Sequence, residues 1–269
     1  ILDKIVANKR LEVMRQKEAV PLDSLLHLGE RNLNRPPHSM RCALEASPVG
    51  IIAEFKRRSP SKGWLFPEAQ VSDVVSTYER EGASACSILT DTEFFGGTFD
   101  DLCNARDLVK LPLLRKDFII DEYQLYQARV MGADVVLLIA AILTEKECKH
   151  FATLAHQLGM EVLLEVHGEE ELSRFNDNID MLGVNNRHLG TFHTDVENSF
   201  RMIERMKLET GQGDEAPVFV SESGISDTAV IRQLRKAGFR GFLIGETFMK
   251  TADPGKTLAS FIHELKVDA

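Results

Sequence analysis

Charged side chains stand where the first long apolar run of this sequence ends. Residues 49–53 are apolar, and Glu54 and Lys56 follow directly. Side chains alternate along a β-strand, so these two charges would share one face with Ile52 and point inward. Burying such a pair costs desolvation energy that its attraction only partly returns. The pair is therefore either a structural salt bridge or part of a reactive site, and this segment alone supports both interpretations.

Polar residues in the same position close four later apolar runs. Lys116 ends one run, Glu165 another, Asn185 and Arg187 a third, and Ser-Glu-Ser-Gly at residues 221–224 a fourth. Lysine can protonate or stabilise a developing alkoxide, and glutamate can accept or relay a proton. Any one of them could be a satisfied structural group, but their common position favours a catalytic site. Three further acids are interpreted as loop and helix-cap groups: Asp91, Asp117 and Asp121.

Two glycine turns late in the chain are candidates for holding a phosphate. Ser223-Gly224 and Gly245-Glu246 each follow an apolar run and precede a helical pattern. Exposed backbone N–H groups at helix N-termini can bind a dianion. The alternative is that the glycines only form tight turns. Because the Glu246 carboxylate would repel phosphate unless it turned away, we assign the role of that turn to its backbone.

A repeating pattern from residue 49 onward supplies the elements that would position these side chains. Short β-branched runs alternate eight times with helical segments, several of which end in a Gly that suits a left-handed C-cap. This pattern predicts a (β/α)8 TIM barrel, whose functional residues lie at the carboxyl ends of its strands. A doubly wound open sheet is the alternative, but the first strand lacks the GxGxxG turn often found there. The expected strands are 50–56, 85–90, 113–116, 135–139, 161–166, 181–185, 218–222 and 241–244.

Residues 1–48 lie outside this repeat and are expected to form an N-terminal helical extension, with residues 49–269 as the barrel domain. One helical face would carry Leu2, Ile5, Val6, Lys9, Val13 and Met14. Such an extension would either plug the bottom of the barrel or cover its mouth. The segment 59–66, with Pro60 and Gly63, could form a rigid turn or a hinged flap.

The composition is that of a folded protein large enough to bury a sizeable core. The chain has 269 residues, of which 43% are hydrophobic, and a net charge of −9. Its basic residues are scattered, so we expect no nucleic-acid partner. The longest apolar stretch, 133–143, is too short for a bilayer and no signal peptide is evident, so we expect no membrane partner and a cytoplasmic location. The four widely spaced cysteines are expected to be reduced core thiols.

The motifs, taken in order, resemble those of indole-3-glycerol-phosphate synthase of the tryptophan pathway, over about residues 2–265. The sequence departs from the usual family pattern at Thr98, His188 and Glu246, none of them an expected proton-transfer group. The resemblance allows fusion to, or association with, other enzymes of that pathway, and we expect a monomer. The matching motifs are IIAEFKRRSPSKG (51–63), SILTD (87–91), FFGG (94–97), LRKDFI (114–119), LEV (164–166), GVNNR (183–187), SESGI (221–225) and FLIG (242–245).

The resemblance implies a carboxy-lyase that needs no metal or organic cofactor. It would convert 1-(2-carboxyphenylamino)-1-deoxyribulose 5-phosphate, a phosphorylated small molecule, into indole-3-glycerol phosphate, carbon dioxide and water. By this resemblance Lys116 is the general acid, Glu165 the base or proton relay, and Glu54 a group that assists dehydration. Lys56 would pair with the substrate carboxylate until it leaves as carbon dioxide.

The remaining roles follow from the same resemblance. Arg187 and Asn185 are expected to hold the anthranilate end of the substrate and to orient Glu54 or Glu165. An apolar wall for the aromatic ring is expected from two phenylalanines, whose alternative role is rim packing. The expected substrate-binding residues are Ser59, Phe95, Phe118, Glu222, Ser223, Gly224, Gly245 and Glu246.

Three other functions fit a barrel with polar strand ends. A phosphosugar isomerase such as phosphoribosylanthranilate isomerase would use an acid/base pair, typically Cys or Asp, to open a ring. An aldolase would form a Schiff base on a lysine. A scaffold subunit would keep the pocket without turnover. Two lysines together with two glutamates fit a decarboxylating ring closure better than any of these.

Overall fold

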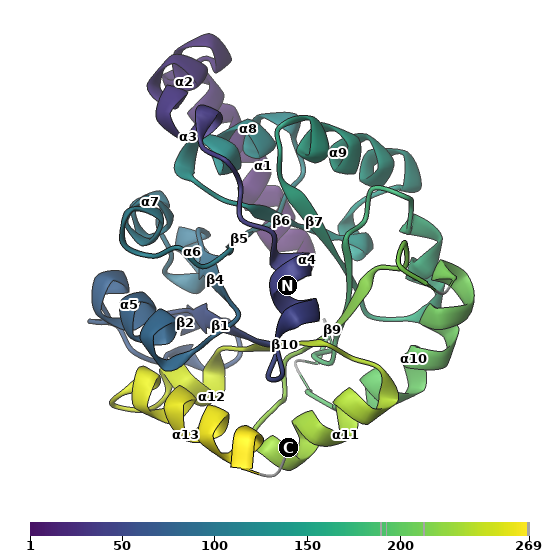
Figure 1. Cartoon of the computed structure of the whole chain (residues 1–269). Helices are drawn as coiled ribbons and strands as arrows, with labels where there is room; N and C mark the ends of the chain where they lie inside the picture. Colours follow the sequence, from purple (N-terminus) through teal and green to yellow (C-terminus); the bar gives the residue numbers. More distant parts are fainter. Residues whose placement is uncertain (189, 192, 212, 268–269) are drawn as a thin grey trace.

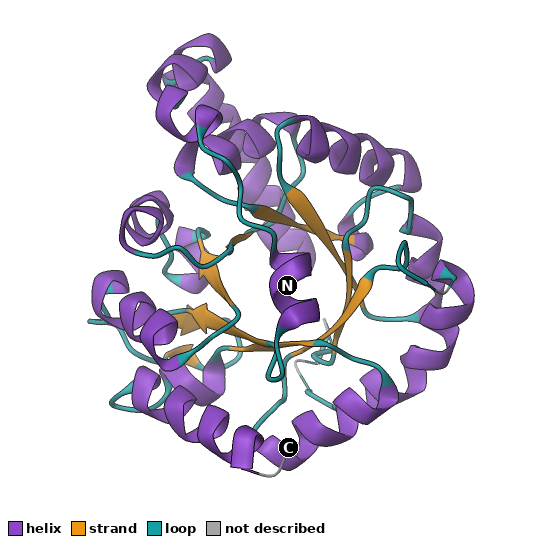
Figure 2. Cartoon of the chain, viewed as in Figure 1, coloured by secondary structure: helices purple, strands orange, loops and turns teal. Residues whose placement is uncertain are grey.

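The protein folds into a closed parallel β-barrel surrounded by helices. The computed structural model describes residues 1–269 except 189, 192, 212, 268 and 269. The strands follow the order β1-β10-β9-β8-β7-β6-β5-β4 around the ring (Figures 1 and 2). Closure confirms the predicted (β/α)8 barrel and contradicts the open sheet. Its strands are β1 (Ile51–Phe55), β4 (Ala85–Leu89), β5 (Leu113–Lys116), β6 (Val135–Ile139), β7 (Glu161–Val166), β8 (Met181–Asn185), β9 (Val218–Glu222) and β10 (Gly241–Ile244).

Strands β5 to β10 have the predicted bounds, and β1 and β4 are shorter than predicted. Gly50 adopts φ 74°, outside the β region, and its N–H is donated to Ser47 Oγ at 2.9 Å. The first strand therefore begins at Ile51. Strand β4 ends at Leu89, one residue before its predicted end. Thr90 still donates its N–H to the Lys116 carbonyl at 3.2 Å, and a difference of one residue is normal at the end of a strand.

The connections between barrel strands are less regular than the pattern predicts. A small hairpin, β2 (Arg58–Ser59) with β3 (Gly63–Trp64), follows β1. A 3₁₀ segment, Glu169–Arg174, follows β7 where a longer helix was expected. The residues after it, Phe175-Asn-Asp-Asn, compete for backbone hydrogen bonds and discourage helix extension. The helices after β1 are α5 (Val71–Glu81), α6 (Thr92–Phe95), α7 (Phe99–Leu108), α8 (Glu122–Met131), α9 (Glu145–Gln157), α10 (Glu197–Thr210), α11 (Thr228–Ala237), α12 (Glu246–Met249) and α13 (Pro254–Val267), with a 3₁₀ turn at Ala140–Ile142.

Two apolar layers stabilise this arrangement. The inner layer fills the barrel with side chains such as Ile52, Leu114 and Leu163, while a larger outer layer joins the strands to the surrounding helices. The cysteines are free thiols, with Cys86 and Cys148 buried and Cys103 half-buried. Cys42 is exposed, so the expectation of a core thiol is wrong there. No described helix is long and apolar enough to cross a membrane.

The end of the N-terminal segment closes the amino end of the barrel. Four helices precede β1, namely α1 (Leu2–Ala19), α2 (Leu22–Leu28), α3 (Glu30–Asn34) and α4 (Met40–Ala46). Met40 and Leu44 of α4 are fully buried in the inner layer. Glu161 at the start of β7 accepts the N–H groups of Met40 and Arg41 at 2.8 and 3.0 Å. Figure 1 shows α4 in front of the ring, with α1 fainter behind it.

The start of the same segment lies at the opposite end. Ile5, Lys9 and Val13 form the buried stripe of α1, whereas Met14 of the predicted face is half exposed. Lys9 forms ion pairs with Asp91 and Asp117, which follow β4 and β5. The extension therefore both plugs the bottom and reaches the mouth, so the two alternatives hold for different helices. The domain boundary drawn at residue 48 stays a prediction.

Candidate active site

A cavity of about 470 Å³ opens at the carboxyl ends of the barrel strands. Thirteen of the fourteen predicted site residues line it. Glu222 does not line it, although its backbone lies at the end of β9. The strand-end pattern therefore identified residues that the fold brings into one cavity, although they lie up to 192 residues apart in the sequence, from Glu54 to Glu246.

A buried carboxylate between two lysines forms the floor of the cavity. Glu54 is 2% exposed and forms ion pairs with Lys56 at 2.9 Å and with Lys116 at 3.4 Å. Ser87 Oγ donates to the same carboxylate at 3.2 Å. Burial alone would raise the pKa of Glu54, but the charges of Lys116 and Lys56 outweigh burial and hold it at about 2. Glu54 is therefore ionised at neutral pH.

Lys116 faces several carboxylates at once. Burial alone would lower its pKa, but Glu54, followed by Glu165 and Glu222, raises the pKa above its usual value. The ammonium form is therefore the stable one at neutral pH. Such a group can stabilise and protonate a developing alkoxide, as the sequence predicts for Lys116.

Glu165 of β7 and Glu222 of β9 form a second acidic pair, on the two strands that flank β8. Both are buried, with 3% and 1% of their surface exposed. Burial, and then the charge of Glu165, raises the pKa of Glu222 well above its usual value. A Cβ on Gly183 of β8 would collide with Glu222 Oε1, so a glycine makes room for this carboxyl group. The environment of Glu222 therefore favours its protonated form more than that of an ordinary carboxyl group.

His167 is a site neighbour that the sequence reasoning missed. Its Nε2 lies 3.5 Å from Glu165 Oε1, and its Nδ1 lies 3.5 Å from Glu171 Oε2. Burial by itself lowers the imidazole pKa, but the nearby carboxylates of Glu171 and Glu165 raise it overall. The only sequence signal was a histidine one residue beyond the end of β7, which is too weak to single it out.

Arg187 joins two loops above the cavity. Its guanidinium pairs with Glu246 at 3.1 Å and also donates to Ser61 Oγ. Asn185 Oδ1 accepts the N–H of Arg187 at 3.0 Å. Because Arg187 balances the charge of Glu246, this carboxylate would repel a bound phosphate less than an unpaired one. Here Arg187 forms its ion pair with Glu246, and the expectation that it orients Glu54 or Glu165 stays a prediction.

The first of the two predicted phosphate turns has a left-handed backbone conformation. Ser223 adopts φ 70° and Gly224 φ 76°, and Asn186 Nδ2 holds this turn by donating to the Ser223 carbonyl at 3.1 Å. A left-handed conformation is costly for serine and is often kept at functional sites. Gly245 serves a second purpose, since a Cβ there would lie 2.5 Å from Glu54 Oε1.

Two phenylalanines and the start of the chain form the apolar side of the cavity. The rings of Phe95 and Phe118 have centroids 5.9 Å apart and are inclined by 37°. Phe95 comes from the short helix α6 rather than from a strand end. Ile5 of α1 lines the same cavity, as do Ile1 and Leu2. These three residues were not predicted, because a local pattern gives no sign that a helix starting at residue 2 reaches this end.

Solved structures of low sequence identity share the barrel. A mutant tryptophan synthase alpha-subunit from Pyrococcus furiosus matches with a TM-score of 0.60 and 15% identity, covering 81% of this chain and 98% of its own. A Streptococcus mutans structure titled KGPDC matches with a TM-score of 0.60 and 11% identity, covering 81% and 97%. At such identities the similarity supports the fold alone.

Closer relatives share one name. A protein from Bacteroides thetaiotaomicron described as indole-3-glycerol phosphate synthase is 56% identical over 268 residues, 99% of each chain. One of the same name from Laribacter hongkongensis is 40% identical over 262 residues, covering 96% of this chain and 97% of its own. The profile of the family described as "Indole-3-glycerol phosphate synthase" matches residues 2–261. Together with the barrel and its acid-and-lysine cavity, these matches show that the chain belongs to the indole-3-glycerol phosphate synthase family, carboxy-lyases of tryptophan biosynthesis.

Proposed function

We propose that the cavity at the carboxyl end of the barrel closes the indole ring of 1-(2-carboxyphenylamino)-1-deoxyribulose 5-phosphate. Carbon dioxide and water leave, and indole-3-glycerol phosphate forms. The observation that carries the proposal is the buried cluster of Glu54, Lys56 and Lys116, with Glu165 lining the same cavity. Such a cluster offers a cation for a carboxylate, an acid for an alkoxide and a base for a ring proton.

Lys116 is the general acid of the proposed ring closure. When the ring carbon attacks the ribulose carbonyl, negative charge grows on the carbonyl oxygen. A lysine that remains protonated at neutral pH stabilises that charge and then donates its proton. Support comes from the carboxylates around Lys116, which raise its pKa. Lys56, 2.9 Å from Glu54, can exchange this partner for the substrate carboxylate.

Glu165 removes the proton needed to complete the indole, and Glu222 supports it. The raised pKa of Glu222 favours its protonated form, which can donate a hydrogen bond to a neighbouring carboxylate. Glu54 assists the loss of the hydroxyl group as water. In this proposal Glu222 acts from behind the cavity wall rather than by touching the substrate, since it does not line the cavity.

The two ends of the substrate bind to chemically different walls. The aromatic end lies against Phe95 and Phe118, which form the apolar side of the cavity. The phosphate end accepts hydrogen bonds from Ser59 and from backbone N–H groups at Ser223, Gly224 and Gly245. Arg187 and Asn185 anchor the substrate from the rim. We propose that the enzyme works as a cytoplasmic monomer without a metal.

The decisive experiment is a fluorescence assay for indole formation from the named substrate, with EDTA present. Appearance of indole emission is the expected result. Failure of turnover with intact binding would overturn the proposal and favour a scaffold or an isomerase. A Schiff-base aldolase is disfavoured, because an imine-forming lysine needs a lowered pKa and that of Lys116 is raised. Borohydride trapping that fixed a carbonyl substrate to the chain would contradict this reasoning.

A further inference from the structure

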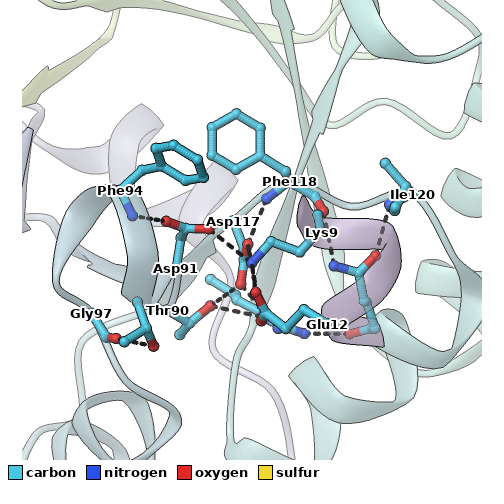
Figure 3. A network of polar contacts seen from close by, with 12 residues as sticks. Lys9, Glu12, Thr90, Asp91, Phe94, Gly97, Asp117, Phe118 and Ile120 are labelled. Carbon is cyan, nitrogen blue, oxygen red and sulfur yellow. Dashed lines mark hydrogen bonds and ion pairs between the residues drawn. The ribbon is translucent and has the colours of Figure 1, made fainter. Parts of the chain in front are cut away.

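A fully buried lysine of the N-terminal helix lies beside the apolar end of the cavity without lining it. Lys9 of α1 is 0% exposed. Its ammonium group lies 2.9 Å from Asp91 Oδ1, 2.9 Å from Asp117 Oδ1 and 3.0 Å from Glu12 Oε2. Figure 3 shows the ammonium group of Lys9 joined by dashed lines to the carboxylates around it. Three segments of the chain therefore meet at one cation.

Burying an ammonium group is expensive, so its position calls for an explanation. The effective penalty is several kcal/mol per ion, and hydrophobic residues of similar volume often replace buried ion pairs without loss. Asp117 does not depend on Lys9 alone, because Arg115 pairs with its Oδ2 at 3.1 Å. The helix has other ties as well, such as the exposed pair between Lys17 and Asp121. Holding α1 on the barrel is therefore not a sufficient reason for Lys9.

Each of the two aspartates that pair with Lys9 holds a backbone segment of the cavity wall. Asp91 is the N-cap of α6, accepting the N–H of Phe94 at 2.9 Å, and the next residue of that helix is Phe95. Asp117 Oδ1 accepts the N–H of Phe118 at 2.8 Å.

The helix that carries Lys9 supplies a further wall residue. Ile5 stands one turn before Lys9 on α1, and its side chain lines the cavity. One charge thus connects the backbone segments that present Ile5, Phe95 and Phe118.

We propose that Lys9 is a positioning residue for the apolar end of the substrate pocket, holding the walls formed by Ile5, Phe95 and Phe118 in register. The inference rests on the proposed function and extends it to a residue that does not touch the substrate. Without Lys9, Asp91 Oδ1 is left buried without a partner among the described residues, because it accepts no hydrogen bond. The loops that carry the two phenylalanines and the helix that carries Ile5 then separate.

The test uses two variants and a matched control on the same helix. Lys9→Met removes the charge at nearly constant volume. Lys9→Met with Asp91→Asn also removes one carboxylate, keeps an N-cap residue on α6, and leaves Asp117 paired with Arg115. Lys17→Met is the control, since it removes an ion pair from the same helix to the rim residue Asp121. Steady-state kinetics and amide hydrogen exchange are measured on each chain.

For the two Lys9 variants we expect KM to rise about tenfold and kcat to stay within about threefold of the wild-type value. The residues proposed to act in the chemical steps stay in place, while the apolar wall that binds the substrate loosens. Amides of residues 2–12, 92–97 and 117–120 should exchange faster together. The Lys17→Met control should change neither. Unchanged KM in a folded variant, or a loss confined to kcat, would overturn the proposal, and so would an equal effect of the control.

A failure of the proposed function is distinguishable from a failure of this inference. Wild-type turnover is measured first, and its absence would refute the proposed function alone, since the exchange comparison among variants needs no substrate. If neither Lys9 variant folds, exchange in the wild type decides. Substrate binding should then protect residues 2–12 together with 92–97 and 117–120, and protection that spares residues 2–12 would refute the role of Lys9.

Discussion

Replacing Glu54 by glutamine should weaken the protein in a manner that depends on pH. The carboxylate is buried and paired with Lys56 at 2.9 Å and Lys116 at 3.4 Å. Glutamine keeps nearly the same shape and loses the charge. Both lysines are mostly buried, with 12% and 17% of their side chains exposed. Water would therefore solvate their charges only weakly after their common carboxylate partner is lost.

The magnitude follows from the pKa of Glu54. Lowering it from 4.5 to about 2 corresponds to about 3 kcal/mol of folding free energy, at about 1.4 kcal/mol per unit. A depressed carboxyl pKa contributes stability that is complete above the unfolded value and is lost as the pH falls through the folded value. Glu54→Gln should therefore cost about 3 kcal/mol at pH 7 and about 2 kcal/mol at pH 3.5.

Urea unfolding of both chains at the two pH values measures this difference. The wild-type advantage should shrink by about 1 kcal/mol between pH 7 and pH 3.5, with an unchanged denaturant slope. The activity of Glu54→Gln should fall as well, since Lys116 loses the carboxylate with which it forms an ion pair at 3.4 Å. An equal cost at both pH values would show that the charge of Glu54 contributes nothing, and the account of the cluster would be wrong.

Three further substitutions probe separate parts of the site. Lys116→Ala should lower kcat by about 10²–10⁴-fold with substrate binding nearly intact, and a residual rate above about a tenth of the wild type would exclude it as the general acid. Arg187→Ala should raise KM about tenfold with a small change in kcat, and a purely chemical defect would argue against anchoring. Gly245→Ala should lower kcat/KM by about 10–100-fold, because the new Cβ would lie 2.5 Å from Glu54 Oε1, whereas unchanged kinetics would show that Glu54 can move freely.

The barrel could be predicted from sequence because its strands are buried on both faces. Parallel strands of this kind give continuous apolar runs, and strands such as Val135–Ile139 and Val218–Glu222 have the predicted bounds. The hairpin of Arg58–Ser59 with Gly63–Trp64 was missed, since strands of two residues have no periodicity to detect. The 3₁₀ segment Glu169–Arg174 was taken for a longer helix, because each strand was expected to be followed by ten or more residues of helical periodicity.

The site could be predicted only as far as strand ends determine it. Lys116 and Glu165 fall at the carboxyl end of the barrel whatever the loops do. The contributions of Ile5 and Lys9 depend on where α1 packs on the barrel, and that position cannot be predicted from the sequence of the extension alone. Lys9 was placed on the buried face of the helix together with apolar residues, but its partners Asp91 and Asp117 lie more than eighty residues away. The pairing of Arg187 with Glu246 depends on loop geometry in the same way.

The pKa values of Glu54 and Glu222 are shifted in opposite directions, which bears on the proposed role of each. Glu54, with a pKa of about 2, is a poor proton acceptor in the empty enzyme. The pKa of Glu222 is shifted the other way, by burial and by the charge of Glu165, so its protonated form is favoured. When the substrate carboxylate takes over Lys56, Glu54 loses one of the two cations that lower its pKa, and its basicity must rise. Glu54 would thereby be a better proton acceptor for as long as the substrate carboxylate occupies Lys56, and departure of carbon dioxide would restore the original pairing.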